Sequence, residues 1–111
     1  MDVKRFVDEL LSALAATRVF ERVALQTEGP IASGRVYAKG STERFLRVYF
    51  NEKTGTMAFA LISEQPRIWG IDFDNRRGWH LHPVENPAEH RMIEPLSVSG
   101  IVLLLEDVLS S

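Results

Sequence analysis

The stretch ERFLRVYFNEKTGTMAFALIS, residues 43–63, decides the fold class. Its first part, residues 43–50, alternates Leu46, Val48 and Phe50 with side chains of the other face, which predicts a strand. The turn-forming run NEKTG follows, and residues 56–63 are apolar on both faces, as is typical of a central strand. Two strands joined by so short a turn run antiparallel.

Two further strands are expected on the N-terminal side of this hairpin. Residues 35–39 lie between two glycines, and the run Lys39-Gly40-Ser41-Thr42 is a suitable turn into the next strand. Residues 19–27 carry apolar side chains at every second position in part of their length, and Glu28-Gly29-Pro30 ends this segment. We therefore expect both segments to extend the antiparallel sheet.

A last strand is predicted on the C-terminal side, after a break at Gln65-Pro66. Residues 67–73 place Trp69, Ile71 and Phe73 on one face, so Trp69 is expected in the core. Five strands with short connections form a meander, because parallel neighbours would need long crossovers.

A helix is predicted at each end of the chain. Asp2 and Ser97 are suitable N-caps. The apolar stripes that follow them have helical spacing and consist of Val3, Phe6, Val7, Leu10, Leu11 and Leu14 in the first helix and Ile101, Leu104, Leu105 and Val108 in the second. The sequence thus predicts one α+β domain over residues 1–111, ordered α-β-β-β-β-β-α, with both helices on one face of a curved sheet.

Composition excludes several classes of protein. The chain is 45% hydrophobic and 25% charged, which is typical of a globular domain, and it has no cysteine for disulfides or thiolate chemistry. Its net charge of −2 argues against a general affinity for polyanions. The amphipathic start does not resemble a signal peptide, and the apolar run at residues 101–105 is too short to cross a bilayer, so we expect a cytoplasmic protein without membrane contact.

The polar chemistry is concentrated between Asp72 and Arg91. Residues 75–96 contain three prolines and little periodicity, which predicts a long loop. All three histidines of the chain, His80, His82 and His90, lie in this segment. The segment is therefore the candidate site, although a long exposed loop is often polar without any function.

One mechanism uses the histidines without a cofactor. An imidazole can take up or give a proton near neutral pH, so His80, His82 and His90 could cleave RNA by acid–base catalysis. The side chains expected to bind the substrate are the cations and the indole around them, namely Arg76, Arg77, Arg91 and, by stacking on a base, Trp79.

The segment around these histidines resembles the TumE-type toxins of prokaryotic toxin–antitoxin modules. The matching residues are Asp74-Asn75, His80, His82 with Pro83, and His90, and the likeness covers about Leu46 to Leu109. The resemblance implies a growth-inhibiting protein that acts on RNA or translation, is neutralised by an antitoxin protein, and uses Asp74 together with the histidines.

Two alternatives remain open at the level of sequence. In the first, His80 and His82 project to one side of an extended segment and bind a metal ion together with Glu85 or His90. In the second, the chain is a partner-binding module or homo-oligomer, because residues 101–105 are apolar all round a helix that is then covered on more than one side.

Overall fold

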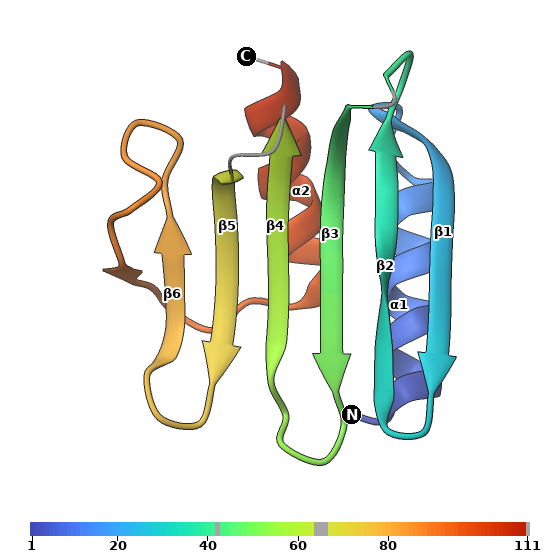
Figure 1. The fold of residues 1–111 in the computed structure, drawn as a ribbon, viewed down its shortest axis with the longest axis vertical. Coiled ribbons are helices and arrows are strands. Elements are labelled where there is room, and N and C mark those ends of the chain that lie inside the picture. Colours follow the sequence, from blue (N-terminus) through green and yellow to red (C-terminus); the bar gives the residue numbers. More distant parts are fainter. Residues whose placement is uncertain (42, 64–66, 111) are drawn as a thin grey trace.

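The computed structural model describes residues 1–41, 43–63 and 67–110, which fold into two helices and a seven-stranded sheet. The elements are α1 (Val3–Ala15), β1 (Phe20–Glu28), β2 (Ile31–Ala38), β3 (Arg44–Asn51), β4 (Met57–Ser63), β5 (Arg67–Asp74), β6 (Gly78–His82), β7 (Arg91–Met92) and α2 (Val98–Ser110). All neighbouring strands are antiparallel, and their order in the sheet is their order in the chain (Figure 1).

The predicted antiparallel meander is confirmed, but the prediction of five strands was wrong. β6 and the two-residue β7 lie in the segment that the sequence predicted to be a loop. β5 is therefore not the last strand, and β4 is the central one, as its apolar character indicated. The expected turn residue Thr42 and the expected break at Gln65-Pro66 lie outside the described residues.

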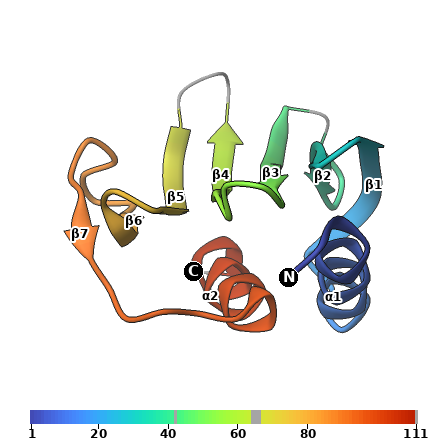
Figure 2. The same cartoon turned by 90° about the horizontal axis from the view of Figure 1, so that it is seen from below.

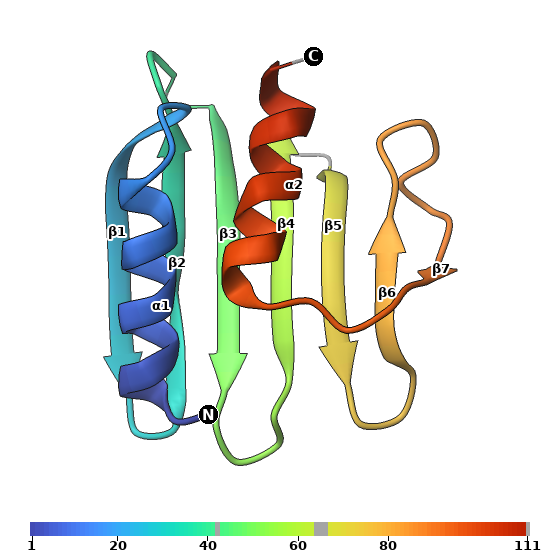
Figure 3. The same cartoon turned by 180° about the vertical axis from the view of Figure 1, so that it is seen from behind.

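Both helices cover the same face of the sheet, as predicted (Figure 2). Seen from behind, α1 lies over β1 and β2, and α2 lies over β3 and β4 (Figure 3). The core forms between these layers, where Phe6 of α1 stacks on Phe50 of β3 with ring centroids 4.6 Å apart. Trp69 is buried there, which confirms its predicted place. Neither of the two described helices lies on the opposite face of the sheet, and we call it the open face.

The helix starts agree with the sequence prediction. The backbone N–H of Arg5 donates to Asp2 Oδ1 at 2.7 Å, and that of Gly100 donates to Ser97 Oγ at 3.0 Å. Two positions of the predicted apolar stripes were wrong, because Leu11 of α1 and Leu104 of α2 are each 43% exposed, whereas Val102 of α2 is buried. No described helix combines the length and the apolar character that a membrane span requires.

Candidate functional site

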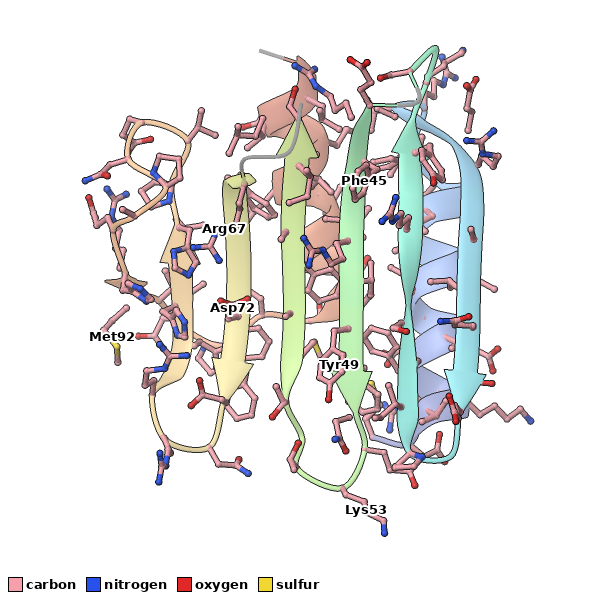
Figure 4. The ribbon with its side chains drawn as sticks, in the orientation of Figure 1. Phe45, Tyr49, Lys53, Arg67, Asp72 and Met92 are labelled. Carbon is pink, nitrogen blue, oxygen red and sulfur yellow. The ribbon has the colours of Figure 1, made fainter. Side chains whose placement is uncertain are left out.

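The hairpin of β5 and β6 positions the first part of the site. Its turn ends at Gly78, the first residue of β6, whose φ of 71° is unfavourable for residues with a side chain. The register pairs Asp72 with His80 and Gly70 with His82. Because side chains alternate across a strand, these four positions share one face, whereas the residues between them face the helices. The face is the open one, and Figure 4 shows Asp72 on β5 turned toward β6.

His90 joins the two strand histidines from the connection between β6 and β7. Two tight turns fold this connection back, with the N–H of Asn86 donating to Pro83 O at 3.2 Å and the N–H of Glu89 to Asn86 O at 3.0 Å. As a result the ring centroids of His90 and His82 are 4.4 Å apart, and one nitrogen from each of the three histidines lies within 4.8 Å of the others. We call His80, His82 and His90 the histidine cluster.

Asp72 lies against the two buried imidazoles of the cluster. Its Oδ2 atom is 3.2 Å from Nε2 of His82 and 3.5 Å from Nε2 of His80. The Asp72 side chain is 23% exposed, whereas those of His80 and His82 are 3% and 1% exposed. A carboxylate and two imidazole nitrogens therefore face one another at the base of the cluster.

The Nδ1 atom of His82 lies beside one hydrogen-bond acceptor and one hydrogen-bond donor. The carbonyl oxygen of Pro87 lies at 3.1 Å and can only accept, while Nη2 of Arg67 lies at 3.2 Å and can only donate. The His82 ring can therefore adopt either of two tautomers. If Nδ1 carries no proton, Arg67 donates to Nδ1 and the Nε2–H group donates to Asp72. If Nδ1 carries the proton, it donates to the Pro87 carbonyl and the lone pair of Nε2 faces the cluster.

His80 is buried without hydrogen bonds. It is 2% exposed, and neither ring nitrogen has a hydrogen-bond partner among the described residues. The contact of 3.5 Å between its Nε2 and Asp72 is at ion-pair distance but does not meet the geometry of a hydrogen bond. An unpartnered buried polar group costs on the order of 1–3 kcal/mol, so a ligand bound to one of these nitrogens would stabilise the buried ring.

His90 is the exposed member of the cluster. Desolvation, followed by the neighbouring imidazoles of His82 and His80, holds the pKa of His90 below its usual value. The neutral imidazole, with one nitrogen free to accept, is therefore favoured. A hollow of about 370 Å³ borders His80 and His90 and is also lined by Arg77 and Met92.

Several side chains predicted for the site lie elsewhere. Asp74 belongs to the turn, where its carboxylate accepts from the backbone N–H of Arg76 at 2.9 Å and from that of Arg77 at 2.7 Å. Trp79 faces the helices and packs on Phe73 with centroids 5.2 Å apart. Neither residue belongs to the histidine cluster.

The acidic residues of the β6–β7 connection are paired with a cation. Arg91 contacts Glu89 at 2.9 Å and Glu85 at 3.3 Å. Hydrogen bonding to Glu89 is the largest cause of a raised pKa of Arg91, so its charge is engaged within the loop. Glu85 is therefore used in this ion pair, and the third nitrogen of the cluster comes from His90.

Sequence reasoning placed Asp72 at the start of the candidate segment without giving it a role, and it left Arg67 out. The signal for Asp72 was the turn-forming run between residues 74 and 78, because a hairpin there brings Asp72 opposite His80. Arg67 had no comparable signal. It reaches the cluster because the chain folds back at residues 83–90 and brings Pro87 beside it, at 3.5 Å from Nη2.

Comparisons of the chain with protein-family models, with curated proteins and with solved structures find no match.

Proposed function

We propose that the chain binds a divalent transition metal ion, best matched by zinc, and uses it as a Lewis acid on a small substrate. The ligands are the imidazoles of His80, His82 and His90, and the carboxylate of Asp72 lies beside them at 3.2 Å from His82 Nε2. Three imidazole ligands with a fourth position left open are a donor set of catalytic zinc centres. The donor set belongs to one hairpin and the loop that follows it, so it does not depend on distant parts of the fold.

The observation that carries the proposal is the burial of His80 with both ring nitrogens unpartnered among the described residues. A metal ion on one of these nitrogens compensates the cost of burying the ring. His82 supports the same conclusion, since a ligating histidine commonly donates its second N–H to a backbone carbonyl. Here that carbonyl is Pro87 O, at 3.1 Å from Nδ1.

The spacing of the cluster requires a small closure. Zinc–nitrogen bonds of about 2.0–2.1 Å place two tetrahedral ligand nitrogens roughly 3.3 Å apart, whereas the nitrogens here lie within 4.8 Å of one another. His80 and His82 are held on β6, but His90 lies in the connection to β7. We expect His90 to move inward when the ion binds.

The surroundings fit a catalytic centre better than a structural one. Structural zinc sites are closed by four protein ligands, whereas catalytic sites keep a position for water or substrate. The cluster is bordered by the 370 Å³ hollow at His80 and His90, so a bound ion is reachable from solvent. Such an ion lowers the pKa of bound water and polarises a carbonyl or phosphoryl oxygen.

Metal content and a zinc titration of the purified chain test the proposal. One ion per chain is expected, with binding lost in His82→Ala and kept in Asp74→Asn, which alters a carboxylate outside the cluster. Absence of zinc binding, or equal binding by both variants, contradicts the proposal. Circular dichroism of each variant checks that the fold is retained.

A second candidate function is the RNA cleavage that the resemblance to TumE-type toxins implies. The observation in its favour is an exposed imidazole, His90, with a lowered pKa that borders the same hollow as the guanidinium of Arg77. A neutral base beside a cation suits cleavage of a phosphodiester without metal. An antitoxin protein would then be the natural partner.

Expression of the chain separates the two candidates. Growth arrest and RNA cleavage that persist in excess chelator and disappear in His90→Ala would support the toxin and contradict the metal centre. Cleavage that requires added zinc supports the metal centre. No growth arrest and no cleavage would remove the toxin from consideration.

A partner-binding role rests on a different surface. Leu103 and Leu104 of α2 are 63% and 43% exposed, and the occupant we propose for them is a second copy of the chain. Light scattering tests this, since Leu103→Glu converts a dimer to a monomer if the surface is used. A monomeric starting protein contradicts it.

A further inference from the structure

A groove crosses the open face of the sheet beside the histidine cluster. It has a volume of about 660 Å³, within the range of small-molecule sites. Its lining comes from β3, β4 and β5 and from the turns next to them. Asp72 lies both at the cluster and in this lining, so the groove leads to the proposed metal centre.

Small residues form the floor of the groove. The sheet register aligns Arg47, Ala60, Gly70 and His82 across four neighbouring strands, and these positions share the open face. Two small residues therefore separate a long cation on β3 from a cluster histidine on β6. In the neighbouring row of the sheet, a small residue also lies between two larger polar ones, since Ala58 pairs with Tyr49 on one side and with Asp72 on the other.

The space above Gly70 is confined by its neighbours. A Cβ atom at this position would lie 3.1 Å from the carbonyl oxygen of Phe59, 3.3 Å from Cδ of Arg67 and 3.7 Å from Cδ2 of His82. The stem of Arg67 and the ring of His82 therefore lie over Gly70, and Figure 4 shows Arg67 on β5 turned toward β6. The groove thus has Arg67 on its β6 side and Arg47 on its β3 side.

The two arginines differ from the other charged residues of the groove. Asp74 and Arg77 neutralise each other at 3.1 Å, and Asp72 faces the imidazoles. The side chain of Arg47 has neither a hydrogen bond nor an ion pair with any described residue. The side chain of Arg67 contacts a carbonyl and an imidazole but no carboxylate of the described chain. Positive charge therefore remains uncompensated on both sides of an otherwise apolar floor.

We infer that this groove binds a small molecule that bears a phosphate group, held by the guanidinium group of Arg47, while Arg67 adds positive charge on the β6 side of the groove. Guanidinium donors match the oxygens of a phosphate in geometry and charge. The apolar floor at Ala58, Ala60 and Ile62 accommodates the rest of the molecule. The inference rests on the proposed function, because it names the substrate class that the metal centre would act on.

A small ligand fits the groove better than RNA does. Single-stranded nucleic acid binds along a basic track with aromatic platforms for its bases. Here Asp72 and Asp74 lie in the lining, and the indole of Trp79 faces the core. The chain also has a net charge of −2, so a long polyanion gains little from the rest of the surface.

Calorimetric titration of the zinc-loaded chain with phenyl phosphate tests the inference. The variant Arg47→Gln is compared with Arg35→Gln, its matched control. Arg35 pairs with Arg47 in the sheet register and shares the open face, but its guanidinium lies over the Phe45 ring at 4.6 Å and does not line the groove. We expect Arg47→Gln to weaken binding about tenfold or more, as for a lost charged hydrogen bond, and Arg35→Gln to leave it within about twofold.

Equal effects of the two variants, or no binding of phenyl phosphate, overturn the inference even if zinc binds in full. Phosphate binding by the metal-free chain that is lost in Arg47→Gln supports the groove even if the zinc titration fails. A benzoate titration separates phosphate from carboxylate, and tighter binding of benzoate overturns the assignment. Binding of a single-stranded RNA oligonucleotide without binding of phenyl phosphate overturns it as well.

Discussion

His80 and His82 occupy equivalent positions on one face of β6, yet their hydrogen bonding is opposite. His82 has Asp72 at Nε2 and Pro87 and Arg67 at Nδ1. His80 has a hydrogen bond at neither nitrogen within the described part of the chain. In the absence of metal, His82 is thus expected to stabilise the fold and His80 to destabilise it.

Leucine substitutions in excess chelator check this contrast. His80→Leu removes two unpartnered nitrogens, so the free energy of unfolding should stay unchanged or rise by about 1 kcal/mol. His82→Leu leaves Asp72 and the Pro87 carbonyl without their partner and should lower the same quantity by about 1–3 kcal/mol. Urea denaturation of both variants gives the comparison, and an equal loss in the two would show that His80 has partners in solution.

The sequence indicated the histidines at residue scale but not the residues that complete the site. Their clustering within eleven positions of the chain was visible directly. Asp72 and Arg67 depend on strand register and on the path of a loop, which are tertiary features. The orientation of Trp79 could not be predicted for a similar reason. Its side chain faces the core because it lies in a strand, whereas the prolines of this segment had indicated a loop.

At the scale of elements, the turn between β5 and β6 sets the register of the site. The backbone N–H of Arg77 is the largest cause of a lowered pKa of Asp74, so the folded state favours the carboxylate. A carboxyl group whose pKa is lowered by folding stabilises the folded state when the pH is above the pKa of that group in the unfolded chain, here 3.8. This contribution is lost as the pH falls through the pKa of the group in the folded state.

Asp74→Asn is expected to flatten this part of the acid dependence. The amide oxygen still accepts from the turn but does not titrate. In chelator, the variant should lose less of its free energy of unfolding than the parent chain when the pH is lowered from neutral to below 3.8. Urea denaturation over a pH series measures this, and parallel curves for the two proteins would count against the assigned role of Asp74.

The elements that the sequence predicted and those that it did not differ in length and context. α1, α2 and β1 to β5 have at least seven residues each and were predicted, although β2 begins at Ile31, four residues before the predicted strand at residues 35–39. β6 has five residues and is followed at once by Pro83, and β7 has two. Such short strands form because β5 offers a free edge, which local sequence does not reveal.

Two glycines of the N-terminal hairpin are needed for different reasons, one for lack of space and one for its backbone conformation. A Cβ at Gly34 of β2 would clash with the carbonyl oxygen of Ala24, a backbone atom of β1. Gly34→Ala should therefore cost about 2 kcal/mol or more by disrupting the pairing of β1. Gly29→Ala, at φ 57° with open space around it, should cost about 1 kcal/mol. Thermal unfolding ranks the two variants, and the reverse order would contradict the close contact.

For the whole molecule, the proposed zinc binding would be linked to folding. A ligand that binds the native state alone stabilises it by about 2.7 kcal/mol at a free concentration of one hundred times its Kd. For a domain near 100 residues this corresponds to a rise in Tm of about 10 °C. Calorimetric scans at increasing zinc should show this rise, with no rise in His82→Ala; a constant Tm in the parent chain would contradict native-state binding.

The strand order has a kinetic consequence. Each strand pairs with its neighbour in the chain, so the sheet can form by adding one hairpin at a time and does not require distant segments to meet first. The packing of α1 on α2 is what joins the two ends. Since low contact order accelerates folding, this chain should fold faster than β-sandwich proteins of similar size. Docking of α2 on the sheet and on α1 should be a late event.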